Sequence, residues 1–369
     1  MKQNIQTHIN WLYNPGEKVL IAGPCSAETQ TQVMETAKQI AADFPEAIFR
    51  SGAWKPRTRP NQFEGKGEDA LQWLAEVKKT TGLRVTTEVA IPRHAEQALK
   101  YGIDIFWIGA RTTVNPFMVQ ELAECLRGTN IPVMVKNPLH PDLQLWIGAI
   151  ERFANTGLTK LAAIHRGFYT FEHSEYRNAP RWELVSELKA LYPDLPIICD
   201  ISHIAGTTTL LQMIAQQAVD LQLNGLMIET HCDPKNALSD SQQQVEPDEL
   251  REIMSSLKYR HPYFTQEVID SKMAGIRQKI DELDTLLLSN LGQRMDLARE
   301  IGELKKIHNV SILQLDRWKE VINQCMQKAD DMGLYREFVR NIFIQIHDEA
   351  IRLQAAILTG SEKAPEKID

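Results

Sequence analysis

Positively charged side chains recur at the ends of short apolar segments in the first two thirds of the sequence. Lys55 and Arg57 follow one such segment, and Arg111, Lys136 and Arg166 close three later ones. Arginine and lysine bind phosphate and carboxylate groups through charge-assisted hydrogen bonds. A single arginine at a strand end often only pairs with a neighbouring acid. Five cations brought to one place indicate a small anionic substrate that carries phosphate and carboxylate groups.

A second set of residues combines a thiol, an imidazole and two carboxylates. Cys25, His203, Glu229 and Asp240 stand at or just beyond the ends of apolar segments. Each alone has an ordinary explanation, since a lone cysteine is usually core packing and a lone histidine or aspartate a hydrogen-bonded polar group. Together they form a mixed soft and hard donor set, which suits Mn²⁺, Fe²⁺, Co²⁺ or Zn²⁺ better than Mg²⁺ or Ca²⁺. We therefore predict a divalent metal site, with Mn²⁺ as the first candidate.

Eight short apolar segments, each followed by a helical pattern, must position these residues. Their apolar character is continuous, as in parallel strands buried on both faces. Eight such units favour a (β/α)₈ barrel over an open doubly wound sheet, and the sequence lacks the GxGxxG loop common in open sheets. Barrel active sites lie at the carboxyl ends of the strands, so the charged groups should share one rim. The segments are VLIAGPCS (19–26), AIFRSGAWKP (47–56), RVTTEVA (84–90), IDIFWIGAR (103–111), PVMVKNP (132–138), LTKLAAIHRG (158–167), PIICDISH (196–203) and GLMIETH (225–231).

The alternation stops after Leu257, and the rest of the chain reads as helices. Apolar residues at helical spacing predict one helix over 265–307, roughly 60 Å long, and two more over 313–332 and 335–358. The long helix exceeds what two short partners in the same chain can cover, which indicates an intertwined dimer. Arg294 shares a face with Leu287 and Ile301, and an arginine on an apolar face is costly unless it is paired. A plain dimerisation bundle with snorkelling arginines remains the alternative.

Composition bounds the class of protein. The chain has 369 residues with 43% hydrophobic and 24% charged residues, an ordinary globular balance. Its net charge of −7 excludes a general basic surface for nucleic acid, and no apolar run approaches the roughly 20 residues of a membrane span. Five scattered cysteines argue against a disulfide scaffold, and the first residues do not read as a signal peptide. We expect a cytoplasmic protein that binds neither nucleic acid nor membrane.

The barrel motifs resemble 3-deoxy-D-arabino-heptulosonate 7-phosphate (DAHP) synthase of the shorter type I-beta branch. That family condenses phosphoenolpyruvate with erythrose 4-phosphate. KPRT argues against the sibling eight-carbon sugar-acid phosphate synthase, which uses arabinose 5-phosphate. The motifs that carry the resemblance are AGPCSAE (22–28), KPRT (55–58), IGART (108–112), VKNP (135–138), HRG (165–167), DISH (200–203), ETH (229–231) and ALSDSQQQ (237–244).

The resemblance implies a role for each motif residue. The metal ligands would be Cys25, His203, Glu229 and Asp240. Phosphoenolpyruvate would be bound by Lys55, Arg111, Lys136 and Arg166, and erythrose 4-phosphate by Lys55, Arg57 and Thr58. Lys55 is our hypothesis for the proton-transfer residue.

The helical part resembles the all-helical (AroQ) class of chorismate mutase. The resemblance rests on residues 273–305, LDRW and HDEAIRLQ. It implies that chorismate rearranges to prephenate, with Lys305 and Gln354 at the ether oxygen and Arg277 reaching into the partner's site. Gln314, Trp318 and Ala350 depart from the residues of some members. The implied ligand residues are Arg277, Arg294, Lys305, Arg317 and Gln354.

The sequence therefore predicts a bifunctional shikimate-pathway enzyme. We place the barrel at 1–258, a linker at 259–264, the chorismate mutase domain at 265–360 and a flexible tail at 361–369. Lys55, Lys305 and Gln354 are the expected catalytic residues, and feedback inhibition of the barrel by prephenate or chorismate is expected. The alternative is a DAHP synthase whose helical domain is a non-catalytic dimerisation and ligand-sensing module.

Overall fold

The computed structural model describes residues 9–12, 18–56, 62–171, 174–260 and 267–360. The chain divides into two compact units, Met1–Pro262 and Tyr263–Asp369. Each is described by itself. Within the described residues, no helix is long and apolar enough to cross a membrane.

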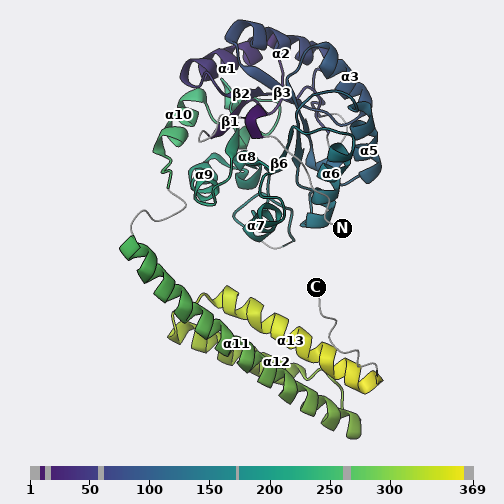
Figure 1. The fold of residues 1–369 in the computed structure, drawn as a ribbon, viewed down its shortest axis with the longest axis vertical. Coiled ribbons are helices and arrows are strands. Elements are labelled where there is room, and N and C mark those ends of the chain that lie inside the picture. The colour runs from purple at the N-terminus through teal and green to yellow at the C-terminus, as the bar shows by residue number, and fades with distance from the viewer. Residues whose placement is uncertain (1–8, 13–17, 57–61, 172–173, 261–266, 361–369) are drawn as a thin grey trace. The chain divides into compact units, whose positions relative to one another are not determined.

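The first unit is a closed barrel of eight parallel strands, and the predicted (β/α)₈ fold is confirmed (Figure 1). Each strand pairs with the next, and β1 closes the barrel by pairing with β8, Val19 opposite Gly225 and Gly23 opposite Glu229. All residues of most strands are buried, as expected of strands covered on both faces. The strands are β1 (Val19–Gly23), β2 (Ile48–Arg50), β3 (Arg84–Glu88), β4 (Ile105–Ile108), β5 (Val133–Lys136), β6 (Leu161–His165), β7 (Ile197–Asp200) and β8 (Gly225–Glu229).

Helices surround these strands, and several of them begin with a side-chain cap (Figure 1). Thr29, Asn115 and Asp142 each accept a backbone N–H of the first turn that would otherwise lack a partner. The α-helices are α1 (Gln30–Asp43), α2 (Glu68–Thr81), α3 (Pro92–Lys100), α4 (Ala110–Thr113), α5 (Pro116–Cys125), α6 (Leu143–Asn155), α7 (Trp182–Leu191), α8 (Ile201–Ala205), α9 (Leu211–Asp220) and α10 (Pro247–Ser256). Short 3₁₀ turns are η1 (Ile9–Trp11), η2 (Thr208–Leu210), η3 (Pro234–Asn236) and η4 (Ser241–Gln243).

The barrel interior is a packed core that is closed at its N-terminal end. Alternate strand residues, among them Ile21, Trp107 and Met134, fill it. Leu12 joins this cluster, and Arg84 at the start of β3 donates to the carbonyls of Trp11 (2.7 Å) and Leu12 (2.8 Å). Trp11 and Leu12 therefore lie against this end, and the predicted functional groups gather at the other.

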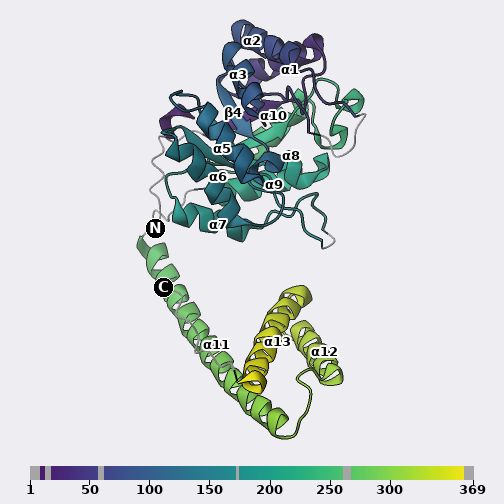
Figure 2. The same cartoon turned by 90° about the vertical axis from the view of Figure 1, so that its right-hand side faces the viewer.

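The second unit consists of three helices, α11 (Glu267–Ile307), α12 (Leu315–Asp331) and α13 (Arg336–Thr359). Their bounds lie within two residues of the predicted ones. Figure 2 shows α13 beside the C-terminal part of α11, and α12 packs against α13. A small cluster of Met326, Ala329 and Val339 is buried between α12 and α13. Along the rest of α11, apolar side chains lie in the open, with 45–60% exposure at Ile276, Ile280, Leu283 and Leu287.

Candidate active site

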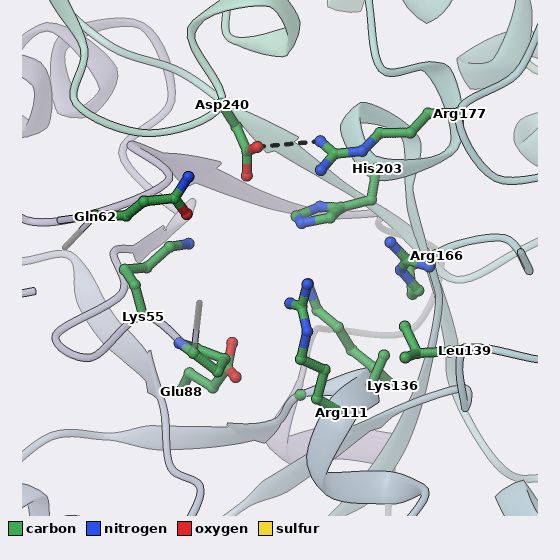
Figure 3. Close-up of a pocket in the computed structure, with 13 residues that line it drawn as sticks. Lys55, Gln62, Glu88, Arg111, Lys136, Leu139, Arg166, Arg177, His203 and Asp240 are labelled. Atoms are coloured by element: carbon green, nitrogen blue, oxygen red, sulfur yellow. Dashed lines mark hydrogen bonds and ion pairs between the residues drawn. The ribbon is translucent and has the colours of Figure 1, made fainter. Parts of the chain in front are cut away.

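A cavity of about 430 Å³ lies at the C-terminal end of the barrel strands. Figure 3 shows the charged ends of its side chains converging on the open space from several different strands and their following loops. This is where barrel enzymes carry their active sites. The cavity is lined by Lys55, Pro56, Gln62, Glu88, Gly109, Ala110, Arg111, Lys136, Leu139, Arg166, Arg177, His203 and Asp240.

Two of the predicted cations are fixed by buried partners. Lys136 Nζ lies 2.7 Å from Asp200 Oδ2, and both side chains are buried. Arg166 donates through Nη1 to Asn178 Oδ1 at 2.7 Å. Burial lowers the pKa of Arg166 to about 10, so its guanidinium stays charged at neutral pH. Arg111, at the start of α4, is more exposed and also lines the cavity.

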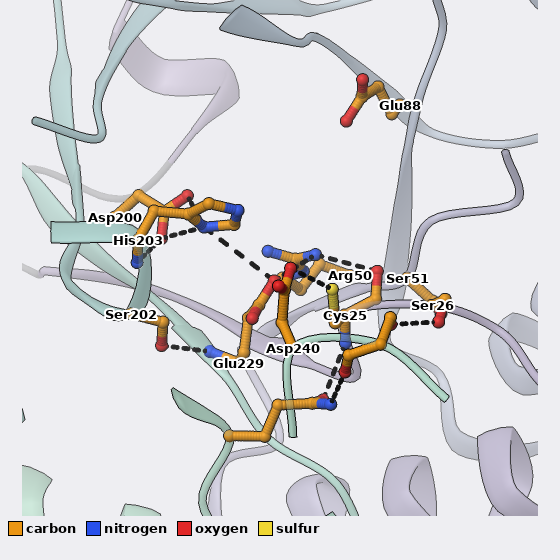
Figure 4. A network of polar contacts seen from close by, with 12 residues as sticks. Cys25, Ser26, Arg50, Ser51, Glu88, Asp200, Ser202, His203, Glu229 and Asp240 are labelled. Carbon is orange, nitrogen blue, oxygen red and sulfur yellow. Dashed lines mark hydrogen bonds and ion pairs between the residues drawn. The ribbon is translucent and has the colours of Figure 1, made fainter. Parts of the chain in front are cut away.

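Three of the four predicted metal ligands meet beside this cavity (Figure 4). The ligand atoms of Cys25, Glu229 and Asp240 lie within 4.8 Å of one another. Cys25 Sγ is 3.3 Å from Asp240 Oδ2 and accepts from Lys55 Nζ at 3.0 Å. The fourth, His203, has its Nδ1 3.9 Å from Glu229 Oε1 and lies just outside this group.

The charges of this group follow from burial and its neighbours. Burial and the nearby Glu229 raise the pKa of Cys25 to about 12, so the sulfur is a thiol in the metal-free chain. Burial alone would raise the pKa of Glu229, but the charges of His203 and Arg50 more than offset it, so its pKa is lowered. The pKa of Asp240 is lowered in the same way, mainly by Arg177 against the effect of burial. Both carboxylates are therefore ionised at neutral pH.

The residues present fit a divalent cation. Glu229 Oε1 is fully buried and accepts no hydrogen bond from the described part of the chain, although Arg50 lies 3.2 Å away. His203 hydrogen-bonds through Nδ1 to Asp200, which leaves Nε2 as the nitrogen for a cation, an arrangement common in metal-bound histidines. Sulfur, imidazole and carboxylate together suit the borderline transition metals.

The sequence reading missed Arg50, which lies beneath this group. Its side chain is 1% exposed, pairs with Glu229 at 3.2 Å, donates to the Cys25 carbonyl at 3.3 Å and stacks over Trp107. Arg50 was overlooked because it stands inside a strand segment rather than at its end. Its position two residues after Ile48 could have indicated it, because alternate residues of a strand point to the same face and Ile48 lies in the barrel interior.

Glu88 is, with Asp240, one of two acidic residues that line this cavity. Its Oε2 accepts from Trp107 Nε1 at 3.0 Å, which fixes the carboxylate. A Cβ placed on Gly109 would lie 2.1 Å from Glu88 Oε1, so any larger residue at this position must displace the Glu88 carboxylate. Arg57 and Thr58, predicted to bind substrate, lie outside the described residues.

In the helical unit, the structure gathers part of the predicted set. Lys305 Nζ donates to Gln354 Oε1 at 3.0 Å, and both side chains are buried. Arg294 on α11 donates to the Ile346 carbonyl of α13 at 3.5 Å. Arg317 is exposed and pairs with Glu320 at 2.6 Å. Trp318, one of the departures from the family pattern, stacks on His347 with ring centroids 3.9 Å apart.

Arg277 is not brought to this group within one chain. It lies near the N-terminal end of α11 and is exposed.

Comparison with known proteins assigns both parts of the chain. The sequence pattern of the DAHP synthetase I family matches residues 6–264. The chain belongs to this family. Residues 276–355 match chorismate mutase type II, so the chain joins a DAHP synthase domain to a chorismate mutase domain and is an enzyme of aromatic biosynthesis.

Individual relatives match the barrel. A phospho-2-dehydro-3-deoxyheptonate aldolase of Thermotoga maritima is 32% identical over 247 residues, covering 66% of this chain and 70% of the relative. The crystal structure of that aldolase from Thermotoga maritima has a TM-score of 0.59 at 31% identity, covering 65% of this chain and 68% of the other. A 2-dehydro-3-deoxyphosphooctonate aldolase of Helicobacter pylori is 26% identical, covering 66% of this chain and 95% of the relative.

We predict that Gly109→Ala slows DAHP formation. The new Cβ must displace the Glu88 carboxylate, and a shift of about 1 Å in a catalytic cavity can lower turnover by about 100-fold. Initial rates of DAHP formation measure the effect, and thermal unfolding reports whether the barrel remains folded.

Gly148→Ala is the matched control. Gly148 lies in α6 and a Cβ there meets no atom within 4 Å, so the rate should not change. Helix propensity should add up to about 1 kcal/mol of stability. A normal rate in Gly109→Ala would show that the Glu88 position is unimportant.

Proposed function

We propose that the barrel condenses phosphoenolpyruvate with erythrose 4-phosphate, using a divalent cation held by Cys25, His203, Glu229 and Asp240. The observation that carries this is the group of three ligand atoms within 4.8 Å, directly beside a cavity lined by fixed cations. A bound cation would supply Lewis-acid polarisation of the aldehyde oxygen. Mn²⁺ is our first candidate, and Fe²⁺, Co²⁺ and Zn²⁺ suit the same donors.

The cationic residues would bind and orient the two anionic substrates. Lys136 and Arg166, held by Asp200 and Asn178, offer preset positive charge to phosphoenolpyruvate, with Arg111 nearer the opening. Arg57 and Thr58 are proposed for erythrose 4-phosphate from their motif alone. Fixed cations lower the repulsion between two phosphorylated molecules and avoid reorganisation during the reaction.

Lys55 is our proposed proton-transfer residue. Burial alone would lower its pKa, but the neighbouring Cys25 and Glu229 raise it, so the ammonium group stays protonated. The enol carbon of phosphoenolpyruvate attacks the aldehyde carbon, and Lys55 can donate a proton to the aldehyde oxygen as it gains charge. Water then adds at the carbon that bears the phosphate, and inorganic phosphate leaves.

We further propose that the helical unit rearranges chorismate to prephenate. The rearrangement is intramolecular, so the protein has only to hold the dicarboxylate in a compact geometry and stabilise the ether oxygen. The buried contact of Lys305 with Gln354 supports their assignment to that oxygen. Arg277, Arg294 and Arg317 are proposed for the carboxylates.

A second copy of the chain is proposed to complete this site. The α11 stripe of Ile276, Ile280, Leu283 and Leu287 is 45–60% exposed in a single copy. A contiguous apolar surface of this kind marks a protein interface. Pairing along α11 would also carry Arg277 toward the partner's Lys305 and Gln354. We propose a homodimer, or a larger assembly built from it, formed through the helical unit.

The cation site predicts a spectroscopic signature. Co²⁺ added to the metal-free enzyme should give a near-ultraviolet thiolate-to-cobalt band, because Cys25 would supply its sulfur. Cys25→Ser should lose the band, and chelator should stop DAHP formation by the wild-type enzyme. Cys125→Ser changes a half-buried cysteine of α5 and is the control. It should keep the cobalt band and the wild-type rate of DAHP formation. A band of normal intensity in Cys25→Ser contradicts the site.

Gln354→Ala should abolish chorismate turnover and leave DAHP formation unchanged. Loss of a donor at a developing oxyanion costs about 100- to 1,000-fold in turnover. Parallel assays of chorismate loss and DAHP formation on the same protein measure both. Gln345→Ala, an exposed glutamine of the same helix, is the control and should not change either rate.

The same assays distinguish a catalytic helical unit from one that only dimerises and senses a ligand. A wild-type chain that binds prephenate but does not consume chorismate would favour a non-catalytic ligand sensor. We also propose that prephenate or chorismate slows the barrel, because one chain joins an early and a later step. A DAHP rate unchanged in saturating prephenate would rule out that inhibition by prephenate.

Subunit complementation tests the shared site. Arg277→Ala and Gln354→Ala should each inactivate the mutase, but a mixed dimer contains one site with both residues intact. Random mixing should therefore restore about a quarter of wild-type chorismate turnover. Lys305→Ala mixed with Gln354→Ala is the control: these residues contact each other within one chain, so no site is complete. Equal recovery in both mixtures would contradict the exchange of Arg277.

A further inference from the structure

Arg177 is a charged residue of the barrel cavity to which the proposed reaction assigns no role. It lies in the segment between β6 and α7, and its guanidinium points toward Asp240 (Figure 3). Nη1 donates to Asp240 Oδ1 at 3.1 Å and to Gln243 Oε1 at 2.6 Å. The side chain is 46% exposed, so an isolated ion pair here would contribute little to stability.

Gln243 extends this contact to a second carboxylate. Its side chain is fully buried, and its Nε2 donates to Glu229 Oε2 at 2.6 Å. One amide therefore accepts from Arg177 and donates to Glu229. Arg177 reaches both carboxylates of the proposed cation site, Asp240 directly and Glu229 through Gln243.

The backbone of Arg177 is tied to α8, the helix that carries His203. Arg177 N–H donates to the Ala205 carbonyl at 3.3 Å, and Asn178 Nδ2 donates to the His203 carbonyl at 2.6 Å. A Cβ on Gly206 would lie 2.4 Å from Arg177 Cβ, so the two segments are in direct contact. The guanidinium therefore starts from a fixed position relative to His203.

The carboxylate of Asp240 is held on both sides, from a backbone in the left-handed region. Its φ of 44° and ψ of 39° place it in the left-handed region, which is uncommon outside glycine and asparagine or aspartate. Arg177 holds Oδ1, while Oδ2 lies 3.3 Å from Cys25 Sγ. One oxygen is thus anchored outside the site and the other faces the sulfur.

We propose that Arg177 is a positioning residue of the cation site, which orients Asp240 directly and Glu229 through Gln243. This rests on the proposed cation site. If Arg177 acted only through its charge, its effect on cation affinity would be the opposite. A nearby positive charge repels a cation, so removing it would tighten binding if charge alone mattered. Positioning predicts weaker binding when Arg177 is removed.

Mn²⁺ affinity of the metal-free full-length enzyme, measured by electron paramagnetic resonance titration, tests the proposal. Arg177→Ala should weaken Mn²⁺ binding about 10- to 100-fold, the usual cost of losing a group that orients metal ligands. Arg177→Lys keeps the charge and a donor and should recover part of the affinity. Arg251→Ala removes an arginine that pairs with Asp43 and Asp248 at the surface, and it should bind as the wild type does. Unchanged or tighter binding in Arg177→Ala overturns the proposal.

Gln243→Leu provides a second, independent variant. It cuts the path to Glu229 and leaves the Arg177–Asp240 pair in place, so it should also weaken Mn²⁺ binding. Because the two residues act through one hydrogen bond, the losses in the double variant should be less than additive. Full additivity would contradict the shared path. Cys25→Ser distinguishes failure of the cation site from failure of the role of Arg177. Unchanged Mn²⁺ binding in Cys25→Ser would contradict the proposed cation site. Weaker binding in Cys25→Ser together with normal binding in Arg177→Ala would overturn only the role of Arg177.

Discussion

The barrel site depends on charge compensation at a closed, buried strand end. Glu229 and Asp200 are fully buried, and an ionised carboxylate in that setting is very costly unless it is paired. Arg50 forms an ion pair with Glu229 from inside the barrel, and Lys136 forms one with Asp200. These pairs keep the carboxylates ionised. Carboxylates suited to a cation therefore lie beside lysine and arginine side chains suited to phosphate. The acidic chain therefore contains a strongly cationic cavity.

The two units reach a defined structure by different routes. The barrel buries a continuous apolar layer between strands and helices, and the predicted site residues that the structure describes lie at one end of it. The helical unit leaves much of α11 uncovered and gathers only Lys305, Gln354 and Arg294. Of the two remaining arginines, Arg317 is exposed on α12 and Arg277 lies near the N-terminal end of α11. The proposed chemistry therefore relies on the proposed association with a second copy to bring Arg277 to the site.

The proposed metal ligands come from elements far apart in sequence, and residues that have no motif of their own contact them. Gln243 and Arg177 contact the carboxylates from a 3₁₀ turn and a loop. Loops that position functional groups are common in barrels, where the strands supply the scaffold. The hydrogen bonds from Arg177 to Gln243 and from Gln243 to Glu229 connect an outer loop to a buried carboxylate.

The sequence by itself determined the eight strand–helix units, the three helices and the shared rim, because hydrophobic periodicity is local and parallel strands place their carboxyl ends together. It also indicated Cys25, Glu229 and Asp240 as neighbours. Only the tertiary structure decided how each charge is compensated. Arg50 was hidden because its partner Glu229 lies on another strand, and Arg177 because its loop carries no periodic pattern. Pairings of this kind depend on distances between segments remote in the chain, which residue types and spacing do not encode.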